Sequence, residues 1–357
     1  MKKHNFNPGP AVLPQEVLQE ASQAIIEYRN TGLSLLEISH RGSDFESIIA
    51  EAISLTKEIL GLSDDYHVIF TTGGASTQFY MMAMNLLNKN EIASYTDTGT
   101  WASKAIKEAK PYGDIKVVGS SKEQNYNFIP KGWAPAPGSR FMHLTSNNTI
   151  FGTQIHEWPD LQIPIVSDMS SDIFSRPIPV HKFGLIYAGA QKNLGPSGVT
   201  MVIIRKDMVR TDLDHYLPPM LDYKTYIAEN SMYNTPPVFP IYVSLLTLRW
   251  IKSKGGLTAL EKINQDKAKL LYDEIDHNPL FKGTVAKEDR SWMNVCFVCE
   301  DSALEPEFET EAKKAGCVNF KGHRSVGGFR ASIYNAMPKS SVQVLVDTMR
   351  DFAKKKG

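Results

Sequence analysis

The sequence predicts an α/β fold of two domains, in which a mostly parallel central sheet is flanked by helices. Short apolar segments alternate along the chain with segments whose apolar residues recur at helical spacing. The chain has 357 residues, more than one hydrophobic core usually organises. We therefore expect an N-terminal segment over residues 1–15, a large sheet domain over 16–256 and a small C-terminal α/β domain over 257–357.

The first half of the chain predicts two helices and then the sheet. Apolar residues recur at helical spacing over 14–28 and over 43–60, where Gly61 ends the pattern. A short apolar strand over 67–70 is followed by a glycine turn and by a helix over 77–87. Further strands are expected over 91–95, 115–118, 141–144, 163–166, 185–188 and 199–205.

The second half predicts a domain boundary followed by two helices. Prolines within 236–240 bracket a turn before an amphipathic helix over 241–254. Thr258 and Glu261 form a capping-box pattern, so a second helix is expected to open there and to run to about residue 276. The remainder is expected to form the smaller α/β unit.

Charge and composition exclude several classes of function. The sequence has 39 Lys and Arg against 39 Asp and Glu, so the protein has no overall field that would attract nucleic acid or an anionic membrane surface. No apolar run approaches the ~20 residues that cross a bilayer, and none follows the basic residues at the start. We therefore expect a cytoplasmic protein without nucleic-acid or membrane partners, in which any anion site is local.

The cysteines predict neither disulfides nor a metal site. There are only three, Cys296, Cys299 and Cys317, which are too few for a disulfide framework. Cys296 and Cys299 spell C-x-x-C, but they lie in a strand-like segment, where residues three apart face opposite sides. Because no second pair completes a zinc site, we expect core cysteines and no metal. The triplet 147–149 matches a glycosylation sequon, which has no such meaning in a cytoplasmic protein.

Residues 187–198 are the most informative segment for chemistry. An apolar strand runs there into a turn of small residues that presents one lysine, Lys192, before the next apolar strand begins. A lysine at the rim of a buried sheet loses solvation, which lowers its pKa and makes the amine a usable nucleophile for Schiff-base chemistry. The alternative is an ordinary surface lysine in a hairpin.

Three further features have both a functional and a purely structural interpretation. Asp168 follows the strand over 163–166, at the edge where open α/β sheets bind ligands, and can pair with the protonated ring nitrogen of a pyridine cofactor or serve as a turn residue. The stretch 73–76 before a helix is either a phosphate nest or a tight turn, and it lacks the dinucleotide and P-loop patterns. Trp101, flanked by small residues, either stacks on a planar ring or packs in the core.

Together these residues resemble the fold-type I pyridoxal-phosphate enzymes of the class V aminotransferase group, over nearly the whole chain. Further matching motifs are 6–11, 39–42, 233–237 and 321–337. The resemblance implies a pyridoxal 5'-phosphate cofactor attached to Lys192, which also moves the proton during the reaction. The other cofactor contacts that it implies are Asp168 at the ring nitrogen, Trp101 stacked on the ring, Thr149 at the ring hydroxyl, Ala75, Ser76 and Gln191 at the phosphate, and Asn234 and Thr235 reaching that phosphate from the second subunit of a homodimer.

The resemblance also implies a reversible two-step amino transfer from glutamate to 3-phosphohydroxypyruvate, which gives 2-oxoglutarate and O-phosphoserine in serine biosynthesis. Each substrate carries an α-carboxylate and a second anion, and arginine suits both groups because it is a permanently charged fork. A site of this charge layout would also admit the four-carbon phosphorylated substrate of vitamin B6 synthesis. The resemblance implies Arg330 for the α-carboxylate and, for the distal anion, His323 and Arg324 together with His40 and Arg41 from across the dimer.

Two alternatives remain open from the sequence. Another class V enzyme, such as a cysteine desulfurase or a small-amino-acid transaminase, would lack the two-anion set, and no cysteine here lies in an obvious glycine-rich active loop. A non-catalytic phosphate-binding protein would keep only the nest. A visible absorbance that borohydride bleaches, with the label on Lys192, would distinguish the enzyme from the binder.

Overall fold

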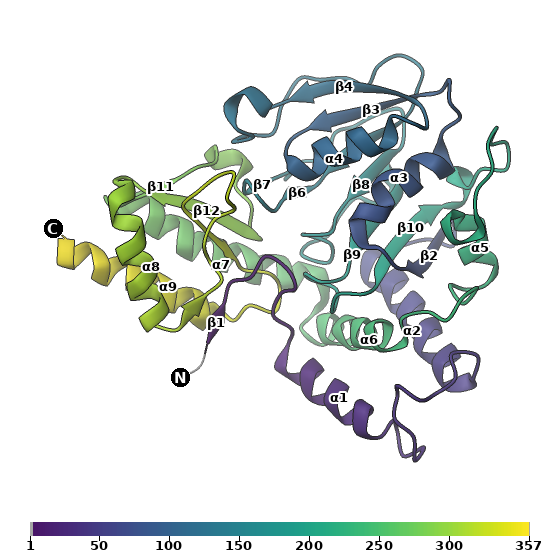
Figure 1. Ribbon diagram of the computed structural model, residues 1–357, viewed down its shortest axis with the longest axis horizontal. Helices are drawn as coiled ribbons and strands as arrows, with labels where there is room; N and C mark the ends of the chain where they lie inside the picture. Colours follow the sequence, from purple (N-terminus) through teal and green to yellow (C-terminus); the bar gives the residue numbers. More distant parts are fainter. Residues whose placement is uncertain (1–2, 357) are drawn as a thin grey trace.

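The computed structural model describes residues 3–356 and contains a seven-stranded sheet with a smaller α/β unit beside it (Figure 1). All the strands predicted between residues 67 and 205 are present, and they form this one sheet. Its members are β2 (Tyr66–Thr71), β3 (Ile92–Asp97), β4 (Asp114–Ser120), β5 (Ser139–Thr145), β8 (Ile165–Asp168), β9 (Phe183–Gly189) and β10 (Thr200–Arg205).

The strand order is β2–β10–β9–β8–β5–β3–β4. From β9 to β4 every neighbouring pair is parallel, whereas β10 runs antiparallel to both β9 and β2. The predicted α/β fold with a mostly parallel sheet is therefore confirmed. Because the carboxyl ends of β5, β8 and β9 lie at one edge in the middle of the sheet, the loops that follow them meet there.

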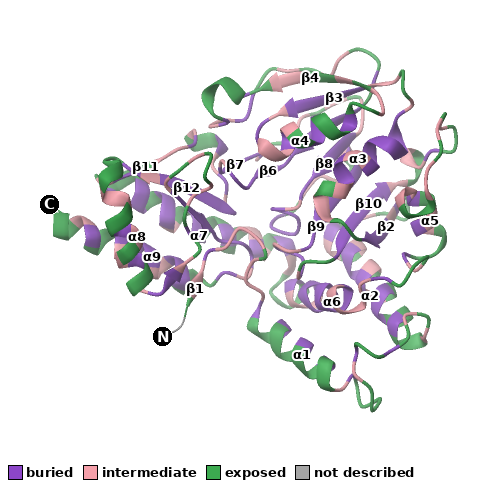
Figure 2. Ribbon diagram, viewed as in Figure 1, coloured by how far each residue is buried: buried purple, intermediate pink, exposed green. Residues whose placement is uncertain are grey.

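Helices cover both faces of the sheet. One face packs against α3 (Gly74–Leu86), α4 (Thr100–Ala109) and α5 (Tyr223–Ala228), and the other against α2 (Ser43–Leu60) and α6 (Val238–Ser253), with α1 (Gln15–Ile26) outside α6. Along β2, Val68 and Phe70 enter one apolar core and Ile69 enters the other, as the two-residue period of a strand requires. The central strands are buried on both faces (Figure 2), which explains their continuous apolar sequences.

The smaller unit has a core of its own. It contains β11 (Phe281–Gly283), β12 (Asn294–Cys299), β14 (Phe329–Ser332), α7 (Gly256–His277), α8 (Glu305–Lys314) and α9 (Lys339–Lys356). The start of the chain joins this core: β1 (His4–Asn5) pairs with β13 (Cys317–Val318), and Phe6 is fully buried among its residues. The N-terminal segment therefore packs with the unit that is farthest from it in sequence.

The predicted capping box at Thr258 and Glu261 is wrong. Helix α7 begins at Gly256, so both residues lie inside the helix, and Gly255 is the N-cap. Gly255 and Gly256 have φ angles of 93° and 73°, a left-handed conformation that glycine adopts without a steric penalty. The glycine pair thus ends α6 and opens α7 directly.

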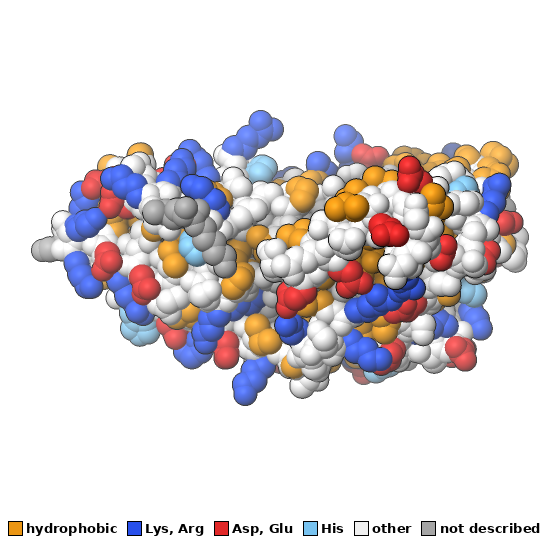
Figure 3. Space-filling view, turned by 90° about the horizontal axis from the view of Figure 1, so that it is seen from below, with side chains coloured by type: hydrophobic (Ala, Val, Ile, Leu, Met, Phe, Trp, Pro, Cys, Tyr) orange, Lys and Arg blue, Asp and Glu red, His pale blue; other side chains and the backbone are white. Residues whose placement is uncertain are grey.

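The cysteines, the surface charges and the helices bear on three further expectations. All three cysteines are buried and unpaired, which confirms that they are core residues. Acidic and basic side chains are interspersed over the face shown in Figure 3, in keeping with the balanced charge of the chain. None of the helices within residues 3–356 is both long and apolar enough to cross a membrane.

Candidate active site

A cavity of about 190 Å³ opens at the carboxyl ends of three neighbouring strands. Its wall includes the last residues of β5, β8 and β9, which are Thr145, Asp168 and Gly189. This is the edge at which open α/β sheets bind ligands. The cavity brings together seven of the residues that the sequence singled out: Ala75, Ser76, Trp101, Thr149, Asp168, Gln191 and Lys192.

Lys192 lies in the turn that follows β9, and its amine points into the site. Its Nζ donates a hydrogen bond to Thr149 Oγ1 at 2.8 Å. Burial lowers the pKa of the Lys192 amine to about 8, although the nearby Asp168 carboxylate opposes this shift. The sequence predicted this direction. The neutral, nucleophilic amine is therefore much more populated near neutral pH than it is in an ordinary lysine.

The N-terminal segment packs against the same lysine. Ala11 N–H donates to the backbone oxygen of Gln191 at 2.8 Å, and a Cβ on Gly9 would lie 3.5 Å from Cγ of Lys192. Residues 8–11 thus pack over the base of the lysine side chain. In the sequence these residues are only part of a family motif, and their packing against Lys192 was not predicted.

Asp168 is a buried carboxylate that accepts a hydrogen bond from the loop directly after it. Its Oδ1 accepts the Ser170 N–H at 2.9 Å, and Ser170 Oγ in turn accepts the Gly189 N–H at 3.1 Å. Burial raises the pKa of Asp168, while the hydrogen bonds from Ser170 and the charge of Lys192 oppose this rise. The carboxylate is therefore suited to hold a protonated ring nitrogen close to the lysine.

The glycine turn before α3 is built as an anion site. The helix begins at Gly74, its N-cap is Gly73, and no side chain in the described structure caps it. Gly73 has a φ of 88°, and a Cβ there would collide with the side chain of Thr77. The first N–H groups of the helix and the positive end of its dipole are thus open to a phosphate. A second cavity of about 240 Å³ adjoins this turn and is lined by Gly73, Gly74, Gly189, Ala190, Gln191, Ser197, Gly198 and Val199.

Trp101 is partly buried and lines the cavity, so its ring is not enclosed in the core. It sits in the first turn of α4, with Lys104 Nζ 4.5 Å from its ring centroid and Phe79 6.4 Å away on another side. The preceding Gly99 permits a close approach of the chain, since a Cβ there would lie 2.7 Å from Asn148 Oδ1. The indole is thereby available to a planar ligand.

Arg330 comes from β14 of the smaller unit and is buried beside the cavity wall. Its Nη1 donates to the backbone oxygen of Thr149 at 3.3 Å, and its buried Nε has no hydrogen-bond partner within residues 3–356. No acidic side chain in the described chain forms an ion pair with it. Since a buried cation without a counter-ion is costly, the guanidinium fits the role of a receptor for a substrate anion.

The residues predicted for the distal anion are not gathered around this cavity. His323 and Arg324 lie on the segment before β14, where burial and the charges of Arg330 and Arg324 lower the pKa of His323. His40, Arg41, Asn234 and Thr235 do not line the cavity within one chain. The last two are exposed. Four of these six residues are the ones that the sequence assigned to the second subunit.

Four polar residues of the cavity wall were not predicted as site residues from the sequence: Thr145, Asn147, Ser170 and Ser171. Ser170 and Ser171 follow Asp168 directly, so the run of small polar residues after a strand was a signal for them. Asn147 is the first residue of the triplet 147–149, which was interpreted only as a glycosylation sequon without a role in this protein. Its contacts lie far away in sequence, which no local pattern reveals.

Comparisons with known proteins agree with this geometry. The family model described as Aminotransferase class-V matches residues 3–345. The chain is 56% identical to the phosphoserine aminotransferase of Parabacteroides distasonis, over 99% of both chains. Among solved structures, that of phosphoserine aminotransferase from Bacillus circulans subsp. alkalophilus superimposes with a TM-score of 0.96 at 48% identity and covers 100% of this chain and 99% of that one.

A third comparison concerns the cofactor. The crystal structure of PLP-bound phosphoserine aminotransferase from Trichomonas vaginalis has a TM-score of 0.93 at 36% identity, covering 98% of this chain and all of that one. Both the family match and the full-length relatives thus agree with the resemblance seen in the sequence. On these grounds, the chain belongs to the class-V aminotransferase family.

Proposed function

We propose that the protein is a phosphoserine aminotransferase that exchanges an amino group between glutamate and 3-phosphohydroxypyruvate, using pyridoxal phosphate. The observation that carries the proposal is that Thr149 is hydrogen-bonded both to the amine of Lys192 and to the buried guanidinium of Arg330, which has no ion-pair partner in the described chain. An amine nucleophile in the cavity and a carboxylate receptor beside its wall are what an amino-acid substrate requires. The relatives of this chain that carry the same activity in their names support the substrate assignment.

The described residues fit pyridoxal phosphate. Its phosphate matches the uncapped start of α3, its ring matches the half-buried face of Trp101, and its pyridine nitrogen matches Asp168. Ala75, Ser76, Gln191 and Thr149 would complete the set from the cavity wall. When bound, this cofactor supplies an aldehyde that takes up amino groups and a ring that withdraws electrons from the substrate.

Each chain residue then has a defined task. Lys192 Nζ would provide the amine that holds the cofactor, and as a free amine it would be the base that moves the proton at the substrate α-carbon. Its lowered pKa keeps it competent as a base near neutral pH. Asp168 keeps the ring nitrogen protonated, and Thr149 Oγ1 orients the lysine amine.

Substrate selection follows from charge. Glutamate and O-phosphoserine share an α-carboxylate, for which Arg330 is the receptor, and both carry a second anion. We assign that anion to His323 and Arg324, together with His40 and Arg41 of the second subunit. The same layout would accept the four-carbon substrate that leads to 4-phosphohydroxy-L-threonine, so a role in vitamin B6 synthesis is part of the proposal.

The proposed enzyme is a cytoplasmic homodimer whose active sites are shared. Four predicted site residues, His40, Arg41, Asn234 and Thr235, do not line the cavity of their own chain. Large apolar side chains are also exposed on a single chain, among them Ile26, Leu36 and Tyr216 at 75%, 61% and 79%. Covering such side chains is a usual reason for association.

Cysteine desulfuration finds no support in the site. Burial raises the pKa of both the Cys296 and the Cys299 thiol to about 12, and neither residue lines the cavity. A thiol held in this way is not the thiolate that the reaction needs. The two-anion transamination is therefore the better assignment.

The direct test is an assay of the purified protein with O-phosphoserine and 2-oxoglutarate, in which glutamate formation is measured by a coupled dehydrogenase. We expect turnover with O-phosphoserine and little with serine, because serine leaves the distal cations unpaired. Preference for serine would overturn the phosphate assignment. The Lys192→Ala variant, which lacks the amine, is the matched blank for background glutamate.

A further inference from the structure

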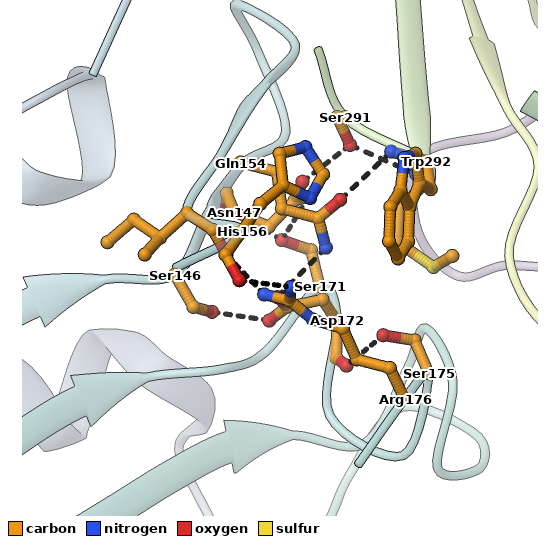
Figure 4. Close-up of polar contacts among 12 residues, drawn as sticks. Ser146, Asn147, Gln154, His156, Ser171, Asp172, Ser175, Arg176, Ser291 and Trp292 are labelled. Atoms are coloured by element: carbon orange, nitrogen blue, oxygen red, sulfur yellow. Dashed lines mark hydrogen bonds and ion pairs between the residues drawn. The ribbon is translucent and has the colours of Figure 1, made fainter. Parts of the chain in front are cut away.

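The side-chain amide of Asn147 joins three segments that are far apart in the sequence. Asn147 lies in the two-stranded hairpin of β6 (Asn147–Asn148) and β7 (Thr153–Gln154). Its Nδ2 donates to Ser171 Oγ at 2.8 Å and to Asn294 Oδ1 at 2.7 Å, and its Oδ1 accepts the Ser291 hydroxyl at 2.5 Å. Figure 4 shows the amide pointing between the loop that carries Ser171 and the segment that carries Ser291.

All the hydrogen-bonding groups of this amide are used inside the protein. The two N–H groups and the oxygen each have a partner, and the side chain is buried. A buried, fully satisfied amide specifies one arrangement of its partners, because any displacement leaves a polar group without a hydrogen bond. Asn147 is therefore suited to fix the distance between the segments that it joins.

One side of this junction is the cofactor side of the cavity. Ser171 lies three residues after Asp168, and its Oγ also donates to the backbone oxygen of Asn147 at 2.8 Å. Thr149, which accepts the hydrogen bond of the Lys192 amine, follows Asn147 by two residues. The position of the amide thus determines where the hairpin places Thr149.

The other side of the junction is the strand pair that carries Arg330. Asn294 is the first residue of β12 and lies opposite Ser332 of β14, and its Nδ2 donates to Ser332 Oγ at 2.9 Å and to Tyr334 OH at 3.1 Å. Two positions before Ser332 on the same strand is Arg330, whose guanidinium reaches back to Thr149. A closed loop of contacts therefore runs from Asn147 through Asn294 to Arg330 and returns through Thr149.

We propose that Asn147 is a positioning residue that sets the place of Arg330 relative to Lys192, and thereby the affinity of the site for the α-carboxylate in both half-reactions. The inference rests on the proposed function, since it takes Arg330 as the carboxylate receptor. Asn147 acts through Arg330 and Thr149. Removal of the Asn147 side chain is expected to lower the affinities for glutamate and for O-phosphoserine by the same factor, because both substrates carry the α-carboxylate.

A merely structural role predicts something different. If Asn147 only stabilised the fold, its loss would lower the melting temperature and leave the affinities of the folded protein unchanged. If it only held the cofactor, its loss would weaken the binding of pyridoxal phosphate and leave the substrate affinities of the loaded enzyme unchanged. Equal losses of glutamate and O-phosphoserine affinity with the cofactor retained distinguish the positioning role from both.

The test compares the holoenzyme with its Asn147→Ala variant in single turnovers, in which the visible spectrum reports the dissociation constant and rate constant of each amino donor. We expect the dissociation constants of glutamate and O-phosphoserine to rise together by about 10-fold, since a small misplacement of a binding group costs this much or more. The spectrum of the bound cofactor should not change. Unaltered affinities, or a loss confined to one donor, would overturn the proposal.

The matched control is Asn264→Ala. Asn264 is also a buried amide that joins the two units, because its Nδ2 donates to the backbone oxygen of Ser175 at 3.0 Å and to Asn335 Oδ1 at 2.8 Å. Its Oδ1 has no partner within residues 3–356, so its side chain makes no hydrogen bond to the hairpin there. Its loss should change either dissociation constant by less than about 3-fold. An equal effect of both variants would mean that general loosening between the units explains the result, and would reject the specific role of Asn147.

A milder variant keeps the proposal testable if Asn147→Ala does not fold. Ser291→Ala removes the hydroxyl that donates to Asn147 Oδ1 and that accepts the N–H groups of Met293 and Asn294. It should raise both dissociation constants by about 3-fold, whereas no change would contradict the positioning role. Failure of the proposed function would appear in the unmodified protein, as absence of turnover with either donor. Failure of the positioning role would appear only in the comparison of variants.

Discussion

The amine of Lys192 donates a hydrogen bond to the hydroxyl of Thr149 at 2.8 Å, although the two residues come from different loops of the sheet edge. The backbone oxygen of the same threonine accepts a hydrogen bond from Arg330. One residue thus contacts both the reacting amine and the proposed carboxylate receptor. Thr149 thus joins the lysine amine to the guanidinium through two hydrogen bonds.

Replacing the lysine should separate chemistry from cofactor binding. Lys192→Ala is expected to abolish transamination, because no other described amine lines the cavity, while the phosphate nest and Asp168 still bind pyridoxal phosphate without a covalent bond. Turnover and cofactor content after dialysis measure the two properties. Lys89→Ala, which alters an exposed lysine, is the control and should behave as the unmodified protein. Full residual activity in Lys192→Ala would refute the assignment.

The reactivity of the lysine should depend on pH in a defined direction. In cofactor-free protein the neutral amine is the reactive form, so the rate of reconstitution with pyridoxal phosphate should rise with pH and level off above a midpoint near the lysine pKa of about 8. The Asp168 carboxylate raises this pKa. Asp168→Asn should therefore move the midpoint to lower pH. An upward shift, or a midpoint near the ordinary lysine pKa of about 10.4, would contradict the described electrostatics.

Removal of the buried guanidinium should weaken the binding of every substrate that carries an α-carboxylate. Arg330→Ala is expected to lower the affinity for glutamate and for O-phosphoserine by between about 10-fold and 100-fold, the usual worth of a charge-assisted hydrogen bond to a carboxylate. Titration of the bound cofactor's absorbance with each donor measures both losses. Arg330→Lys should restore part of the affinity, because a point charge replaces the fork. Unchanged glutamate affinity in Arg330→Ala would show that another group binds the carboxylate.

The glycine turn should be sensitive for a reason that goes beyond backbone strain. Gly73→Ala is expected to lower pyridoxal phosphate affinity, since the new methyl group collides with Thr77 at the phosphate nest. Gly61→Ala is the matched control, because Gly61 also has a positive φ, of 66°, but has open space around it. The positive φ alone should cost each variant about 1–2 kcal/mol of stability, and the collision with Thr77 should add to the loss in Gly73→Ala. Only Gly73→Ala should lose the cofactor. Equal cofactor affinity in the two variants would show that the glycine turn does not bind the cofactor phosphate.

A buried lysine in the smaller unit should matter for stability. Lys267 Nζ donates to the backbone oxygens of Ile333 and Tyr334 at 3.0 and 2.7 Å, in the turn after β14. Lys267→Met leaves the Ile333 oxygen without a donor, whereas the Tyr334 oxygen keeps the N–H of Met337 at 2.9 Å. The change should cost about 1–3 kcal/mol of unfolding free energy, measured by urea denaturation. Lys262→Met, an exposed position on the same helix, should change stability by less than about 0.5 kcal/mol. Similar values for both variants would contradict the bridging role.

Local sequence patterns were sufficient where the chemistry lies at the end of a strand. Lys192 and Asp168 directly follow or end apolar strands, so the strand pattern alone places them at the binding edge of the sheet. The capping box failed because two glycines with positive φ open helix α7 earlier than Thr258. Here the backbone freedom of glycine outweighed the side-chain signal.

Contacts between distant segments were not predictable from one sequence. The hydrogen bond between Ser291 and Asn147 joins residues 144 positions apart, and that between Tyr334 and Pro8 joins residues 326 positions apart. Propensity and periodicity describe only neighbours along the chain. The packing of the N-terminal segment over Lys192, and the closed loop of contacts through Asn147, therefore emerged only from the folded structure.

Borohydride reduction of the holoenzyme, followed by peptide mapping, tests the central claim most directly. Hydride adds to the carbon–nitrogen double bond between lysine and cofactor and fixes the cofactor on the residue that holds it. We predict loss of the visible absorbance, with the pyridoxyl group on the peptide that contains Lys192. A label on any other lysine, or a protein that never takes up the chromophore, would contradict the account.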